Sequence, residues 1–384
     1  MPSGTLPVTM RAAVMYDVDD IRIEERPLPA LDPGDALVRT AASGVCSGDL
    51  MPWYVRKKAP FVFGHEPAGT LVAFGDGGPD GDAARSAPGA DAAALRNERR
   101  PALGDRVFAH HHAPCLRCAA CRAGSFVHCA TWRVTSLDPG GMAEFFRVPR
   151  ANLVDTLVLP ERLSFADASL IEPLGCVVKS LRRAFGLPAG APLVRPLAAG
   201  ARNLDDMTLY VIGAGVMGLM HVAVATALGA TVYASDFYAG RRELARALGA
   251  SAAFEPANAQ AALADATGSA LADVTICGPG SPPALEAAVA ATGADGTVLM
   301  FTPIDPHERF TFDQSAAYFR DLRLVSSYSC GPPDTRDALD LIAGGVVTAA
   351  KLHATSFTFP AVAAAYSEMR AARVVKAIVH FAGA

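Results

Sequence analysis

The 384-residue sequence has no long apolar run and no long basic run. No stretch approaches the ~20 apolar residues of a membrane span, and the first 20 residues contain no apolar core of signal-peptide length. The net charge is −4, and no cluster of Lys and Arg is long enough to attract nucleic acid or an anionic membrane. We therefore expect a cytoplasmic protein whose partners are small molecules, with no nucleic acid or membrane among them.

Aromatic residues are also few, at 7%, but half of the residues are hydrophobic, which excludes disorder as the main state. The chain is too long for one compact core and has the length of two ordinary domains. In a cytoplasmic protein its eight cysteines indicate thiols and metal ligands rather than disulfides.

Four of these cysteines lie within fifteen residues, at Cys115, Cys118, Cys121 and Cys129. Four thiolates at this spacing predict a tetrahedral zinc with no open position, which braces a loop and does no chemistry. Because four sulfurs saturate the metal, we interpret the histidines at 110–112 as a solvated strand end. The remaining Cys176, Cys277 and Cys330 are expected to be buried thiols.

The pattern of predicted strands and helices changes near Leu209. Before it, short alternating or apolar segments such as Met10–Tyr16 and Ala36–Ala42 predict a β-rich half. After it, predicted strands and helices alternate, which indicates a parallel sheet covered on both faces. Two small and polar stretches, at about 76–103 and 187–206, are interpreted as surface insertions.

A glycine-rich turn, Gly213-x-Gly215-x-x-Gly218 with Val216 and Met217 inside it, follows the first strand of the second half and opens a helix. Asp236 stands at the end of the next strand, as in dinucleotide-binding units. The helix N-terminus would stabilise a pyrophosphate, and Asp236 would bind the ribose hydroxyls and repel a 2′-phosphate, which favours NAD over NADP.

Three further residues accompany this pattern. Arg241 is ambiguous, because it could lie along the ribose, accept a phosphate or be a solvated residue of a first helical turn. Gly278 and Thr302 follow two later strands and are expected to border the nicotinamide.

A second group of candidate ligands combines a thiolate, an imidazole and carboxylates, at Cys46, His65, Glu66 and Glu172. This mixture suits a zinc with one place left for water or substrate. Taken alone, Cys46 would more often be a core cysteine. The order Gly44-Val45-Cys46, then Gly64-His65-Glu66-Pro67, then Glu172-Pro173-Leu174 resembles the zinc-containing medium-chain alcohol dehydrogenases, in their polyol and threonine dehydrogenase branch.

The resemblance implies an α/β protein with a GroES-like β-rich catalytic domain, from residues 1–178 and 331–384, and a Rossmann NAD-binding domain, from residues 179–330. It implies two zinc ions per chain, one catalytic and one structural, with Cys46 and His65 as ligands and Glu66 and Glu172 as ligands or water-mediated neighbours. It also implies hydride transfer between a secondary alcohol or polyol, or the matching ketone, and NAD in a homodimer or homotetramer.

One departure concerns the proton relay. Relatives usually have Ser or Thr two residues after the ligand cysteine, and some have a histidine three residues further on, but here Gly48 and Met51 stand at these positions. Ser47, Glu66 or water could carry the proton instead, and Asp49 is interpreted as a structural hydrogen-bond acceptor. A set of aromatic residues could line a substrate pocket or simply belong to the core: Trp53, Tyr54, Phe63 and Trp132.

The missing relay leaves two other functions open. A lyase or epimerase could use tightly bound NAD transiently, without net release of NADH. A catalytically inactive relative could bind metal and nucleotide only.

Overall fold

The computed structural model describes residues 6–78, 99–193 and 204–382. It divides into two compact units, and each is described by itself. The first unit contains Met1–Pro173, Cys330–Ala343 and His353–Ala384, and the second contains Leu174–Ser329 and Gly344–Leu352. The boundaries suggested by the sequence, after residues 178 and 330, stay predictions. The predicted insertions fall largely on residues 79–98 and 194–203, outside the described residues.

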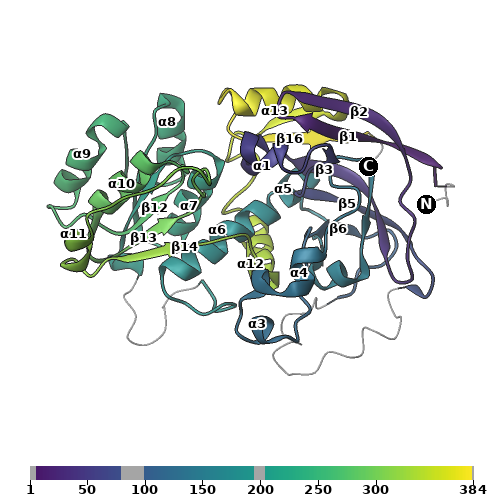
Figure 1. Ribbon diagram of the computed structural model, residues 1–384, viewed down its shortest axis with the longest axis horizontal. Coiled ribbons are helices and arrows are strands. Elements are labelled where there is room, and N and C mark those ends of the chain that lie inside the picture. Colours follow the sequence, from purple (N-terminus) through teal and green to yellow (C-terminus); the bar gives the residue numbers. More distant parts are fainter. Residues whose placement is uncertain (1–5, 79–98, 194–203, 383–384) are drawn as a thin grey trace. The chain divides into compact units, whose positions relative to one another are not determined.

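Two sheets build the first unit, which confirms its predicted β-rich character (Figure 1). A seven-stranded sheet has the order β15-β16-β3-β5-β6-β8, with β7 also paired to β3, and a smaller sheet has the order β2-β1-β4. The strands are β1 Thr9–Asp17, β2 Asp20–Pro27, β3 Ala36–Gly44, β4 Phe61–Val62, β5 Pro67–Phe74, β6 Arg106–Ala109, β7 Phe145–Val148, β8 Thr156–Val158, β15 Thr355–Thr358 and β16 Ala377–His380. Strand β16 pairs antiparallel with β3, so the end of the chain completes a sheet begun near its start.

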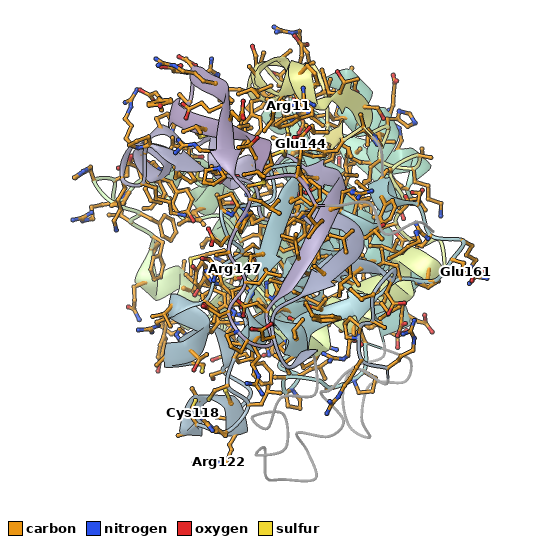
Figure 2. The ribbon with its side chains drawn as sticks, turned by 90° about the vertical axis from the view of Figure 1, so that its right-hand side faces the viewer. Arg11, Cys118, Arg122, Glu144, Arg147 and Glu161 are labelled. Atoms are coloured by element: carbon orange, nitrogen blue, oxygen red, sulfur yellow. The ribbon has the colours of Figure 1, made fainter. Side chains whose placement is uncertain are left out.

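Short helices connect the strands of the first unit: η1 Ser47–Leu50, α1 Pro52–Arg56, α3 Ala119–Arg122, η4 Phe126–His128, α4 Ala130–Val134, η5 Arg150–Asp155, α5 Phe165–Ala168, α12 Pro332–Ala343, η8 Phe359–Ala361 and α13 Val362–Arg370. Figure 2 shows Cys118 and Arg122 on a lobe at one end of this unit, while Arg11 and Glu144 form an ion pair of 2.6 Å at the other end. The lobe is the segment that contains the four closely spaced cysteines.

A six-stranded, wholly parallel sheet forms the second unit. Its strands are β9 Thr208–Ile212, β10 Thr231–Ser235, β11 Ala252–Phe254, β12 Ala272–Cys277, β13 Thr292–Met300 and β14 Arg323–Ser326. Their order, β11-β10-β9-β12-β13-β14, reverses direction beside the first strand, which is the topology of a doubly wound dinucleotide-binding sheet.

Helices pack around this sheet (Figure 1). They are α6 Ile171–Ala184, which begins in the first unit, η6 Leu204–Asp206, α7 Val216–Ala227, α8 Ala239–Ala247, η7 Pro256–Asn258, α9 Ala259–Ala266, α10 Pro282–Ala291 and α11 Gln314–Tyr318. The alternation expected from the sequence is confirmed, although β11 and α9 were missed. Among the described residues, no helix is both long and apolar enough to cross a membrane.

Candidate metal and dinucleotide sites

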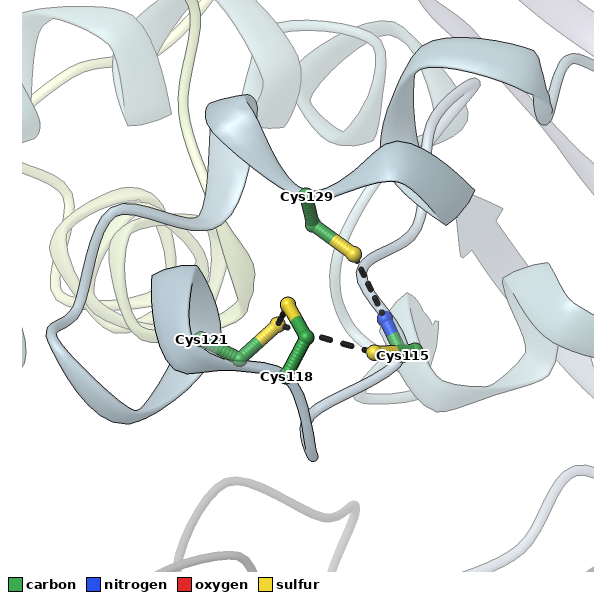
Figure 3. A group of neighbouring side chains, drawn as sticks. All are labelled: Cys115, Cys118, Cys121 and Cys129. Atoms are coloured by element: carbon green, nitrogen blue, oxygen red, sulfur yellow. Dashed lines mark hydrogen bonds between the residues drawn. The ribbon is translucent and has the colours of Figure 1, made fainter.

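The four cysteines of the lobe bring their sulfurs together (Figure 3). The Sγ atoms of Cys118 and Cys121 are 3.5 Å apart, and those of Cys115 and Cys121 are 4.0 Å apart. Four ligands at Zn–S distances of about 2.3 Å in a tetrahedron place their sulfurs about 3.8 Å from one another. The spacing therefore fits a zinc ion held by all four thiolates.

Electrostatics in the lobe also favour a cation. Burial alone would raise the pKa of Cys129, but hydrogen bonds from backbone amides, among them that of Cys115 at 3.3 Å, bring it to about 6. The pKa of Cys121 is raised by burial, by its hydrogen bonds to neighbouring thiols and by the charge of Cys129. Sulfurs this close cannot all ionise without a cation between them, and zinc supplies one.

Apart from the four cysteines, few side chains stabilise the lobe. Its apolar cluster is small, with Phe126, Val127 and Trp132 packed against the cysteines. Trp132 thus belongs to the core of the lobe, and His112 lies against its ring with a centroid distance of 4.1 Å. We infer that metal binding contributes much of the folding free energy of this segment.

Cys46, His65 and Glu66 form a second group in the first unit. Cys46 follows β3 and begins η1, while His65 and Glu66 lie between β4 and β5, immediately before β5. One ligand atom of each lies within 4.8 Å of the other two. The segment after the end of β3 and the segment before the start of the neighbouring β5 therefore bring a sulfur, an imidazole nitrogen and a carboxylate oxygen together.

The ring of His65 lies beside a buried carboxylate. Its Nδ1 lies 3.5 Å from Oδ2 of Asp49, which leaves Nε2 as the nitrogen available to a metal. Burial would lower the pKa of His65, but the charges of Cys46, Asp49 and Glu172 raise it well above its ordinary value. Asp49 Oδ2 is buried without a hydrogen-bond partner, so the role of Asp49 as a structural acceptor stays a prediction.

Glu66 is only 1% exposed and pairs with Lys376, which is equally buried. Lys376 uses Oε2 of the carboxylate and also donates to the carbonyl of Val45 at 2.9 Å, whereas Oε1 of Glu66 has no hydrogen-bond partner. Gly44 makes room for this pair, because a Cβ there would stand 2.0 Å from Glu66 Oε2. A buried carboxylate oxygen without a partner costs free energy, and a metal beside Cys46 would satisfy it.

Glu172, in the first turn of α6, was predicted to be a ligand or a water-mediated neighbour of the catalytic metal, and this stays a prediction. Its carboxylate groups with His110 and Cys330, not with Cys46 and His65, although its charge reaches His65. The interpretation of His110 as solvated was wrong, because its side chain is fully buried and bonded to Asp155. Three consecutive histidines suggest a polar, exposed segment. Nothing in the sequence indicates that the buried carboxylate of Asp155 forms a hydrogen bond with His110.

The other histidines of the triplet are half-buried. Of the three expected thiols, Cys277 and Cys330 are buried and Cys176 is partly exposed.

The surroundings of Cys46 contain one residue that sequence reasoning missed. Tyr366 on α13 is 1% exposed, and its hydroxyl has no hydrogen-bond partner. Burial, together with the charges of Asp49, Cys46 and Glu66, raises its pKa well above the ordinary value. Phe63 meets the Tyr366 ring edge-on at 4.8 Å, so Phe63 is a core residue beside the metal ligands.

The expected relay residues also lie beside Cys46. Ser47 is half-buried, and the amide of Gly48 donates to Cys46 Sγ at 3.3 Å. Trp53 and Tyr54 are half-buried on α1 and pack edge to face at 5.8 Å.

The glycine turn of the second unit has the geometry of a pyrophosphate cradle. Gly213 has φ +85°, which favours glycine, and a Cβ at Gly218 would stand 1.9 Å from the carbonyl oxygen of Gly213. At Gly215 a Cβ would meet nothing within 4 Å, so the space beside this backbone is open. Helix α7 begins at Val216, directly after the turn, and Met217 is the next residue of its first turn. The residues therefore fit a dinucleotide.

Asp236 lies directly after β10, beside this turn. Its Oδ2 accepts from the amide of Ala214 at 2.8 Å and its Oδ1 from the amide of Tyr238 at 2.9 Å. Arg241 lies 3.8 Å from Asp236 Oδ2 and stacks over the ring of Tyr238. A carboxylate has lone pairs for more than these two bonds, so Asp236 can still accept from ribose hydroxyls.

Gly278 and Thr302 follow β12 and β13, at the carboxyl ends of neighbouring strands of the sheet. The amide of Gly278 donates to the carbonyl of Ile212 at 2.9 Å, and a Cβ at Gly278 would stand 2.7 Å from that oxygen. This close approach draws the end of β12 against the end of β9, where the glycine turn begins.

Comparison with known proteins finds two family models in the chain. The alcohol dehydrogenase GroES-like domain matches residues 32–160, and the zinc-binding dehydrogenase model matches residues 216–344. A curated relative from Aspergillus clavatus, named probable D-xylulose reductase A, is 27% identical over 394 aligned positions that cover 98% of each chain.

Two solved structures share the fold across the whole chain. A putative zinc-binding dehydrogenase from Sinorhizobium meliloti bound to NADP has a TM-score of 0.76 at 25% identity and covers 97% of this chain and 99% of its own. A 2R,3R-butanediol dehydrogenase from Bacillus subtilis has a TM-score of 0.75 at 21% identity with the same coverage. With both models matched in order and both units of the expected fold present, the chain belongs to the zinc-containing medium-chain alcohol dehydrogenase family.

Proposed function

We propose that the chain is a zinc-dependent oxidoreductase that transfers a hydride between a secondary alcohol or polyol, or the matching ketone, and NAD. The observation that carries the proposal is the donor set of Cys46, His65 and Glu66, with one Glu66 oxygen buried and unsatisfied. Sulfur, nitrogen and one carboxylate oxygen are three ligands, and three ligands leave a catalytic zinc one position for substrate. The names of the curated relative and of the butanediol dehydrogenase supply the class of substrate.

Each residue of the proposed catalytic group has a separate part. Cys46 and His65 bind the metal, Asp49 orients the His65 ring, and Glu66 is the third direct ligand through its Oε1. Glu172 adds negative charge near His65 and is not a direct ligand of this zinc. A bound zinc would supply Lewis acidity toward the substrate oxygen, and NAD would accept the hydride.

The cofactor is bound by the second unit. The backbone at Gly213, Gly215 and Gly218, with Val216 and Met217 at the start of α7, holds the pyrophosphate. Asp236 binds the adenosine ribose and disfavours a 2′-phosphate, with Arg241 along the ribose, while Gly278 and Thr302 border the nicotinamide.

The decisive experiment is a panel of secondary alcohols, polyols, amino alcohols and ketones followed by NADH absorbance. We expect turnover with net formation or consumption of NADH for at least one secondary alcohol or polyol pair. Cys46→Ser should lose turnover together with one zinc per chain, while Cys176→Ser, outside both groups of ligands, should keep both. Product formed without NADH would instead establish the transient use of NAD, and no turnover with any substrate would establish an inactive relative.

The proton carrier is proposed to be Ser47. Ser47→Ala should lower kcat by about 10²–10⁴ with little change in NAD affinity, because acid–base help of this kind contributes that much to the rate. Gly48→Ser should restore part of the loss, since a Cβ at Gly48 meets only Cys46 Sγ, at 3.5 Å, and φ there is ordinary. Full activity of Ser47→Ala, together with low activity of Glu66→Gln in its zinc-bound form, would transfer the role to Glu66.

We also propose a cytoplasmic homodimer or homotetramer, on the analogy with relatives and on the eight free thiols. Light scattering of the purified protein tests the oligomeric state.

A further inference from the structure

A third group of metal-ligand side chains lies in the first unit, outside the two already described. It consists of His110, directly after β6, Glu172, in the first turn of α6, and Cys330, two residues before α12. One ligand atom of each lies within 4.8 Å of the other two, and all three residues are buried. Three segments far apart in the sequence thus place a nitrogen, an oxygen and a sulfur around one point.

The ring of His110 is oriented as it is in metal sites. Its Nδ1 is 2.8 Å from Oδ2 of the fully buried Asp155, and its Nε2 is 3.6 Å from Cys330 Sγ. With the Nδ1 hydrogen donated to the carboxylate, the lone pair of Nε2 faces the thiol. A carboxylate behind a histidine fixes the tautomer of a metal ligand and raises its basicity.

The carboxylate of Asp155 is itself held in place. The hydroxyl of Thr335 on α12 donates to its Oδ1 at 2.5 Å, and the backbone amide of His110 donates to the carbonyl of Asp155 at 3.1 Å. Asn152 donates to the carbonyl of His110 at 3.0 Å. Ligand and supporting residue are therefore both fixed before any ion binds.

This arrangement repeats that of the proposed catalytic group with different residues. There, Cys46, His65 and Glu66 come together with Asp49 behind the Nδ1 atom of His65. In the third group a Cys, a His and a Glu come together with Asp155 behind the Nδ1 atom of the histidine. The two ligand sets share no residue, and the charge of Glu172 acts on His65, so the two groups are neighbours.

We propose that His110, Glu172 and Cys330 form a third metal site, which takes a zinc-class divalent cation. A thiolate, an imidazole and a carboxylate are ligands that zinc accepts together, whereas magnesium and calcium take oxygen. Because the group is fully buried and joins β6, α6 and α12, its metal would cross-link these elements and would not meet substrate. The site does not depend on the proposed dehydrogenase activity.

Metal analysis of the full-length protein tests the site. After saturation with zinc chloride and desalting, inductively coupled plasma mass spectrometry should give three zinc ions per chain. Cys330→Ser and His110→Gln should each give two, with the activity of the catalytic zinc retained. The matched control is Cys277→Ser, a buried thiol whose Sγ donates only to the carbonyl of Pro279 and lies in no ligand group, and it should keep three.

A separate variant distinguishes the third site from the catalytic site. Cys46→Ser should also lower the count from three to two, but with loss of turnover. Two zinc ions in the wild type and no change in Cys330→Ser would overturn the third site while leaving the dehydrogenase proposal intact. An unchanged count in Cys46→Ser would count against the catalytic site only.

Two measurements need no disruptive substitution. Zinc anomalous scattering from wild-type crystals should show a peak between His110 Nε2, Cys330 Sγ and the Glu172 carboxylate, and an empty position there beside two occupied sites would refute the proposal. Thr335→Val, which removes only the hydroxyl behind Asp155, should weaken the third zinc about tenfold in competition with a chromogenic chelator, the lower end of the usual effect of such residues. A purely structural hydrogen-bond network would leave the chelator titration unchanged.

Discussion

The buried pair of Lys376 and Glu66 gives the sharpest test of the catalytic group. Lys376→Met removes the counter-charge of a carboxylate that is 1% exposed. Breaking a buried pair from one side costs about 3–5 kcal/mol, because the remaining charge stays buried without compensation. We therefore expect the metal-free first unit to lose about this much free energy of unfolding.

The zinc-loaded protein should lose less. If Glu66 Oε1 binds the metal, the zinc charge compensates the carboxylate that Lys376→Met leaves behind. By the thermodynamic cycle, a cost smaller by about 1.4 kcal/mol in the loaded form corresponds to zinc binding about tenfold more tightly to the variant. An equal cost in both forms, or weaker zinc binding, would refute the direct role of Glu66.

The assay can follow the first unit alone. The chain has two tryptophans, Trp53 and Trp132, and both belong to the first unit, so urea unfolding by tryptophan fluorescence reports on it. Lys57→Met, at the exposed residue directly after α1, is the matched control and should stay within about 0.5 kcal/mol of wild type. The double variant with Glu66→Gln should recover most of the loss in the metal-free form, since no buried charge remains.

Three further predictions concern other parts of the molecule. A mild chelator should remove the Cys46 zinc before the lobe zinc and abolish turnover while circular dichroism stays unchanged, because the lobe site is closed by four thiolates; simultaneous loss of the Cys46 zinc, the lobe zinc and the structure would contradict this order. Asp236→Ser should reduce the preference for NAD over NADP in kcat/KM at least about tenfold, and a wild-type preference for NADP would show that Asp236 does not select the cofactor. Burial lowers the pKa of His221 to about 4, below its unfolded value near 6.5, so its contribution to stability is complete above pH 6.5 and is lost as the pH falls toward 4. The loss of unfolding free energy is at most about 3 kcal/mol. His221→Leu should reduce the pH dependence of hydrogen exchange in α7. An unchanged pH dependence in the variant would show that other groups cause it.

The fold followed from sequence where patterns were long and regular. Strand β10, Thr231–Ser235, ends directly before Asp236, where the sequence predicted the end of a strand, because an apolar run between a glycine and a helix start fits few other structures. Strand β11, Ala252–Phe254, and helix α9 were missed, because a three-residue strand and a run rich in alanine have weak periodicity. Contacts with neighbouring elements decide whether such segments become strands or helices.

The sites followed from sequence only where the ligands are close along the chain. The four cysteines and the Gly-His-Glu motif are local patterns, and both proved to be clusters. Lys376 pairs with a residue 310 positions away, and Cys330 meets His110 across 220 positions. A single sequence has no signal for such partners, which explains why His110 was taken for a solvated residue and why Cys330 was not expected beside His110 and Glu172.

The position of β16 has a consequence for the order in which the protein acquires its structure. This strand, Ala377–His380, pairs with β3, and Lys376 directly before it neutralises Glu66. When the ribosome has synthesised the whole second unit, it has therefore not yet synthesised β16 and Lys376, which complete the first unit. Because domains generally fold as units during synthesis, the second unit can fold while the first still lacks a strand of its sheet. A nascent chain cut short by even its last ten residues would hold a formed nucleotide unit beside an unfinished metal centre.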